Sequence, residues 1–130
     1  MTLTRIFAAV VALDILGVIV AISTGLADFG DAIVLVGTPL SAPFTFVAVQ
    51  ALAVLAATRC RVAAAFLALL CVVSITSGFF DGSFTDAELT AAHRAVQVAL
   101  GIATVSLGAL AVRAAVRPRR AEPALASAAC

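Results

Sequence analysis

Four long and almost uncharged apolar stretches limit what this chain can fold into. They cover residues 6–25, 42–58, 62–80 and 91–112. A transmembrane helix needs roughly 17–25 such residues, so each stretch can cross a bilayer, the second only just. Only 12% of the chain is charged, whereas soluble domains have about 25%. We therefore predict an all-α fold, a bundle of four transmembrane helices.

Residues 1–112 form a single membrane domain in this interpretation. Ser41 and Pro43 are typical of the start of the second helix, and Thr85 and Glu88 have the spacing of a capping box before the fourth. Residues 113–130 combine arginine, alanine and two prolines without apolar periodicity. We expect this segment to be a disordered, basic tail.

The arginines predict how the helices are oriented, because cytoplasmic flanks of membrane proteins collect Lys and Arg. Only Arg94 would lie on the outer side of a four-span chain. Seven arginines share the other side: Arg5, Arg59, Arg61, Arg113, Arg117, Arg119 and Arg120. Both termini are therefore predicted to be cytoplasmic, with an outer loop at 27–41 that contains an apolar run at 32–37. The lysine-free, alanine-rich composition indicates a multi-pass protein of a bacterial plasma membrane.

An alternative concerns the first stretch alone. Gly25 and Ala27 place small residues where a signal peptide would be cleaved. The apolar run is longer than that of an ordinary signal peptide, and Asp14 interrupts it. Both interpretations stay open, a first span that is retained and one that is cleaved off as a signal peptide.

One polar or thiol side chain lies near the middle of each predicted span: Asp14, Gln50, Cys71 and Thr104. Each is nine or ten residues from the arginine that bounds its span on the cytoplasmic side. If all helices start at one level, equal rise per residue places these side chains at one depth, near the membrane midplane. The sequence thus predicts a membrane-embedded polar layer.

Asp14 has two interpretations. As a structural residue, its neutral carboxyl would be hydrogen-bonded to Gln50 or Thr104. As a functional residue, it would bind a proton or a cation in a transport pathway, because acids inside spans mark such pathways.

Small residues also repeat at helical spacing, at Gly17, Ala21 and Gly25 and again at Thr104 and Gly108. Such faces allow helices to approach closely, either inside the bundle or in a homodimer.

A second candidate site lies outside the membrane. Its residues are Asp28, Asp31, Asp81, Asp86, Glu88 and His93. Carboxylates and an imidazole could bind a cation there, although such acids are more often solvated loop charges. We recognise no established metal motif and no catalytic triad in the chain, and expect no cofactor.

These features favour a non-enzymatic membrane protein that acts through helix packing as an accessory or oligomeric component. The alternative is a small proton- or cation-coupled transporter or channel that uses Asp14. Expected partners are the bilayer, anionic lipids at the arginines of the tail, and a second copy or another membrane protein. With a net charge of +1 and no Lys, Trp or Tyr, the chain carries no footprint for nucleic acid.

Overall fold

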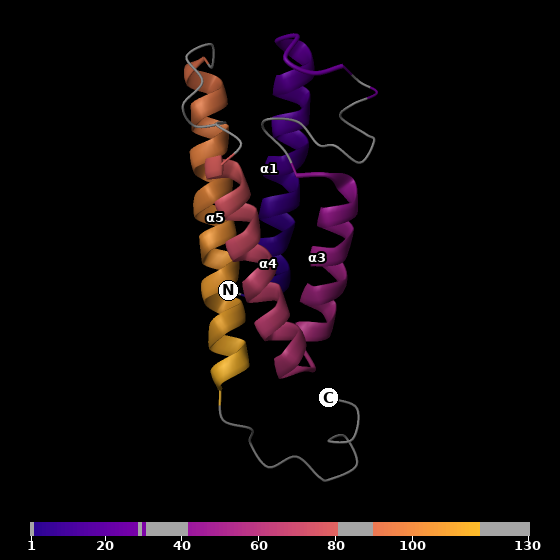
Figure 1. The fold of residues 1–130 in the computed structure, drawn as a ribbon, viewed down its shortest axis with the longest axis vertical. Coiled ribbons are helices and arrows are strands. Elements are labelled where there is room, and N and C mark those ends of the chain that lie inside the picture. The colour runs from indigo at the N-terminus through magenta and orange to yellow at the C-terminus, as the bar shows by residue number, and fades with distance from the viewer. Residues whose placement is uncertain (1, 29, 31–41, 81–89, 118–130) are drawn as a thin grey trace.

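The computed structural model describes residues 2–28, 30, 42–80 and 90–117. Within these residues it contains four α-helices and no strand: α1 Leu3–Ser23, α3 Phe44–Ala57, α4 Arg61–Phe80 and α5 Ala91–Val116. The helices run side by side along the long axis of an elongated bundle (Figure 1). The prediction of an all-helical bundle is confirmed.

The two ends of the bundle differ in which helices they connect. At one end, here called the hairpin end, residues 58–60 join α3 directly to α4. At the opposite end, called the His93 end, α1 finishes and α5 begins (Figure 1). In the bundle, α5 packs against both α1 and α4, and α3 packs mainly on α4, while α1 and α3 share a smaller contact.

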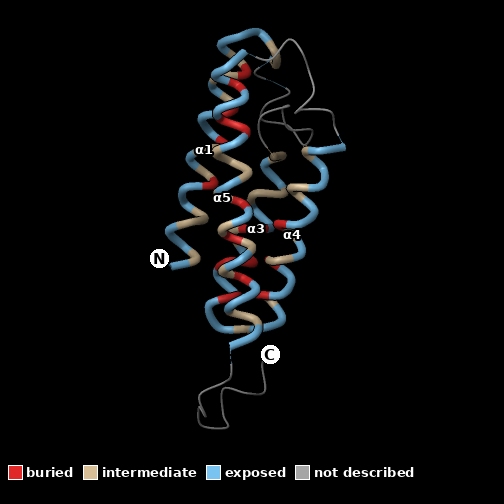
Figure 2. Tube along the Cα trace, turned by 90° about the vertical axis from the view of Figure 1, so that its left-hand side faces the viewer, coloured by how far each residue is buried: buried red, intermediate tan, exposed pale blue. Residues whose placement is uncertain are grey.

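The bundle has an apolar exterior. Large apolar side chains are exposed on every helix, including Ile19, Leu52, Leu69 and Ile102. Buried positions recur as short separate segments along each helix, with exposed positions between them (Figure 2). Exposed apolar surface of this extent suits lipid rather than water. By length and composition α1, α4 and α5 are able to cross a membrane, so the chain is a small membrane protein.

The second predicted span is shorter than expected. α3 has 14 residues, which gives a length of about 21 Å, below the ~30 Å of a hydrocarbon core. Pro43 explains the late start, since the residue before a proline is disfavoured in helical geometry. Pro43 itself is the N-cap residue and has a non-helical ψ of 141°, so the helix starts at Phe44.

The helices do not start at one level. In Figures 1 and 2 the N-terminal end of α1 lies partway along the bundle, whereas the α3–α4 connection and the end of α5 extend beyond it. A residue a given number of positions after the start of α1 therefore lies closer to the His93 end than a residue of α3 or α4 that is the same number of positions from the hairpin.

Candidate functional site

Asp14 lies on the inner face of α1, where it is buried together with Val10, Gly17 and Ala21. Its Oδ1 accepts a hydrogen bond of 3.1 Å from the backbone N–H of Ala42. Ala42 precedes the first residue of α3 by two positions. The carboxyl group of α1 therefore holds the chain at the point where it begins α3.

This contact satisfies a backbone donor that the helix itself cannot. Ala42 lies outside α3, before the N-cap residue Pro43, so no carbonyl of the helix accepts its N–H. Ala42 is half-buried, and a backbone N–H left without an acceptor away from water is costly, so the Asp14 oxygen stabilises the start of α3. The Thr104 hydroxyl donates instead to the carbonyl of Leu100 in its own helix, at 2.8 Å. In the described part of the chain, Asp14 is thus bonded to the backbone and not to Gln50 or Thr104.

All four residues of the predicted polar layer are buried. Their exposed fractions are 7% for Asp14, 2% for Gln50, 1% for Cys71 and 5% for Thr104. The register between α1 and α5 follows from Thr24, whose Oγ1 lies 3.0 Å from Nε2 of His93. Asp14 is ten residues before Thr24, and Thr104 is eleven after His93. Because the helices are antiparallel with equal rise, Asp14 and Thr104 lie at nearly the same depth.

The other two residues lie at other depths. Cys71 is opposite Gly108, where an added Cβ atom would stand 3.2 Å from the Cβ of Cys71. That position is about one helical turn from Thr104 toward the hairpin end. Gln50 follows Ala42 by eight residues, so it is roughly 10 Å closer to the hairpin end than Asp14. The polar residues are spread along the bundle, because α1 starts at a different level from the hairpin.

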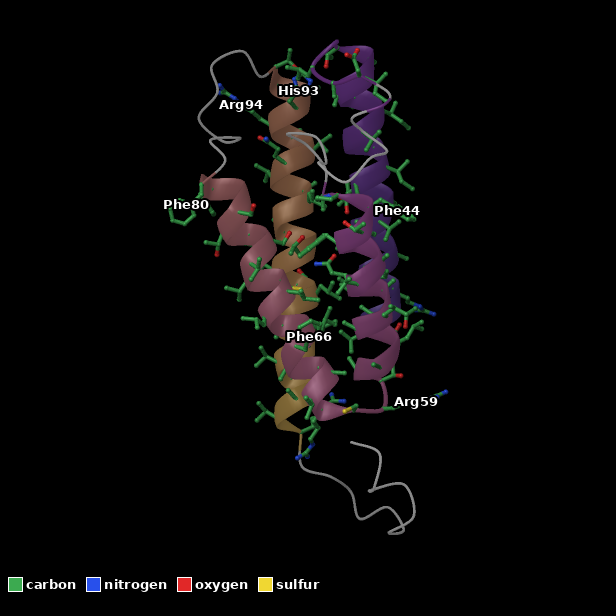
Figure 3. All side chains as sticks on the ribbon, turned by 45° about the vertical axis from the view of Figure 1, so that its right-hand side comes forward. Phe44, Arg59, Phe66, Phe80, His93 and Arg94 are labelled. Atoms are coloured by element: carbon green, nitrogen blue, oxygen red, sulfur yellow. The ribbon has the colours of Figure 1, made fainter. Side chains whose placement is uncertain are left out.

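His93 joins the ends of two helices. It is 1% exposed, and Figure 3 shows it on the side of α5 that faces α1, with Arg94 on the other side. The backbone N–H of Thr90 donates to Nδ1 of His93 at 3.0 Å. Since Nδ1 accepts, we assign the ring proton of the neutral tautomer to Nε2, which donates to Thr24.

Thr90 and His93 also form the capping box of α5, with His93 in the place where Glu or Gln is usual. Thr85 and Glu88, which have the spacing of a capping box in the sequence, lie outside the described residues. The sequence did contain the signal for the observed capping box. Thr90 and His93 have the same spacing as Thr85 and Glu88 and lie five positions later.

The predicted outer cation site can be placed only in part. Asp31, Asp81, Asp86 and Glu88 lie outside the described residues. Asp28 is exposed beyond the end of α1. Both ring nitrogens of His93 are engaged, so it could ligate a metal only by giving up one hydrogen bond. Among the residues that the structure describes, no group of three His, Cys, Asp or Glu side chains could hold a metal ion. The cation site stays a prediction.

The small residues within α1 and α5 face the interior of this single bundle, whereas Gly25, expected on the same face, lies after the end of α1 and is exposed. Gly17, Ala21 and Thr104 are buried, and Gly108 is in close contact with Cys71 on α4. These residues thus pack within one chain, and the homodimer stays a prediction.

Comparison with known proteins gives no relative. No protein-family model, no curated protein and no solved structure matches the chain. Its function therefore has to be inferred from its own residues.

Proposed function

We propose that this chain is a non-enzymatic integral protein of a bacterial plasma membrane, acting through helix packing as an accessory or oligomeric component. One observation carries the proposal: two buried polar side chains, those of Asp14 and His93, connect separate parts of the bundle. Asp14 bonds to the backbone before α3, and His93 bonds to Thr24 at the end of α1. Side chains engaged in this way organise a scaffold.

The exterior supports the same proposal. Every helix presents exposed apolar side chains along its length. In a bilayer such a surface can exchange lipid for the helices of another protein without exposing polar groups, and van der Waals packing then decides the partner. A small bundle with a rigid interior and an apolar exterior suits a component of a larger membrane assembly.

Cross-linking in intact membranes tests this function. The proposal expects a cross-linked product of defined mass that contains either a second copy or one further membrane protein in fixed ratio. As a control, the membrane is dissolved in a denaturing detergent before the cross-linker is added. This treatment separates the proteins and should abolish the product. A chain that stays monomeric at every cross-linker concentration would contradict the proposal.

A specific observation also supports a second candidate, a proton- or cation-coupled transporter or channel. Asp14 is buried near the middle of a 21-residue apolar helix and faces the start of a helix too short to cross. Helices that begin within the membrane, and acids at such depth, occur in transport sites. The two candidates differ in whether Asp14 has to release a proton for the protein to work, which a flux measurement decides.

A further inference from the structure

The hairpin end brings together arginines from two distant parts of the sequence. Arg59 and Arg61 belong to the connection between α3 and α4, and Arg113 and Arg117 belong to the end of α5. All four are exposed. The Nη2 of Arg61 donates a hydrogen bond to the backbone carbonyl of Arg117, so the two parts are in direct contact. We call these four residues the arginine cluster.

The described residues offer this cluster no carboxylate. The acids among them are Asp14 and Asp28. Asp14 is bonded to Ala42 inside the bundle, and Asp28 follows α1 at the His93 end. Four positive charges therefore share one end of the bundle without an acid beside them in this part of the chain.

The cluster also lies where the apolar exterior stops. Val62, next to Arg61, is 70% exposed, and Val116, next to Arg117, is 73% exposed. Outward-facing apolar side chains thus continue up to the arginines on both helices. In a membrane protein such a transition marks the boundary between hydrocarbon and headgroups. In a bilayer, this boundary would place the guanidinium groups at the level of the lipid phosphates.

We propose that the arginine cluster binds the phosphodiester headgroups of anionic phospholipids. A guanidinium presents several N–H donors in one plane, a geometry that suits phosphate oxygens. The bond from Arg61 to Arg117 orients one guanidinium and leaves its remaining donors for a phosphate. The site includes the hairpin and so extends beyond the basic tail. It requires that the chain spans a membrane, and it holds whether the chain acts through packing or through transport.

Lipid selectivity of the purified full chain tests the site. The protein, in a neutral detergent, is equilibrated with equal amounts of phosphatidylglycerol and phosphatidylcholine, and bound lipids are counted by native mass spectrometry. The parent should prefer phosphatidylglycerol. The variant Arg59→Gln/Arg113→Gln/Arg117→Gln should lower that preference by at least roughly tenfold, from the usual effect of a basic residue near an anionic surface. These substitutions leave the acceptor of Arg61 in place, because it is a backbone carbonyl.

Arg94→Gln is the matched control, since Arg94 is also exposed but lies at the His93 end. It should keep the preference of the parent. An unchanged preference in the triple variant, or no preference in the parent, would overturn the proposal. Inorganic phosphate is the second arm, compared with chloride at equal ionic strength. Selective displacement of the lipid by phosphate would assign the cluster to free phosphate and so overturn the lipid site.

Discussion

The Nε2 atom of His93 lies 3.0 Å from the Oγ1 atom of Thr24, and this contact joins residues that are 69 positions apart in the sequence. The Thr24 hydroxyl in turn donates to the carbonyl of Val20 at 2.8 Å. A continuous set of hydrogen bonds therefore runs from the N–H of Thr90 through the imidazole to a carbonyl of α1. This polar contact connects the end of α1 to the start of α5 at the His93 end.

A double-mutant cycle measures how much this contact contributes to the free energy of unfolding. Thr24→Val and His93→Ala should each destabilise the fold, by about 1–3 kcal/mol where a buried polar group loses its partner. The double variant should cost less than the sum, with a coupling of about 0.5–2 kcal/mol. Unfolding in detergent micelles, followed by circular dichroism, gives the four stabilities. Additive effects would show that the two side chains do not interact.

The role of Asp14 at the start of α3 predicts a difference between two substitutions. Asp14→Asn retains an oxygen that can accept the N–H of Ala42, so this variant should be nearly as stable as the parent. Asp14→Leu has no acceptor and should cost about 1–3 kcal/mol, because the backbone donor is left unpaired. The same unfolding measurement compares the two. If Leu were tolerated as well as Asn, the contact with Ala42 would not contribute to stability.

Gly108 predicts where side-chain volume is not tolerated. Any Cβ at this position stands 3.2 Å from Cys71, so Gly108→Val should push α5 away from α4 and cost about 1–3 kcal/mol. Gly101 is the matched control, since no heavy atom lies within 4 Å of its added Cβ. Gly101→Ala should be neutral or stabilise the helix by up to about 1 kcal/mol. Equal effects of both substitutions would contradict the close packing of α4 on α5.

The predicted orientation of the helices is tested by cysteine labelling of intact cells. In a chain whose natural cysteines are replaced by alanine, a cysteine at Ser83 should react with an impermeant maleimide. A cysteine at Arg59 should react only after the membrane is permeabilised. The reason is the arginine distribution, which predicts a cytoplasmic hairpin. The opposite pattern of labelling would invert the topology.

The fold was predictable because apolar length is a local property. The stretch that begins at residue 91 corresponds to a helix that starts at Ala91, and the burial of Asp14 and Thr104 was expected from their faces. The short length of α3 was harder to predict from the sequence. It depends on the backbone of Ala42 and Pro43, which is not helical, whereas the apolar stretch already begins at Ala42.

The partners of the polar residues could not be derived from the sequence. Asp14 bonds to a backbone N–H. Every non-proline residue has such a group, so the identity of the residue at position 42 does not indicate the contact. The prediction of one shared depth assumed that arginines mark one level on all helices. The offset of α1 (Figure 1) shows that this assumption does not hold. Counted along α3 from the Asp14–Ala42 contact, Gln50 lies closer to the hairpin end than Asp14.

The most direct test of the account is proton flux through proteoliposomes that contain the parent or Asp14→Asn, with a pH-sensitive dye inside. If Asp14 holds the start of α3 and does not carry protons, both proteins should acidify the vesicles no faster than empty liposomes. Circular dichroism of the same vesicles confirms that each protein is folded. Flux through the parent that Asp14→Asn abolishes, with the helices intact, would contradict the packing role and establish a transport residue.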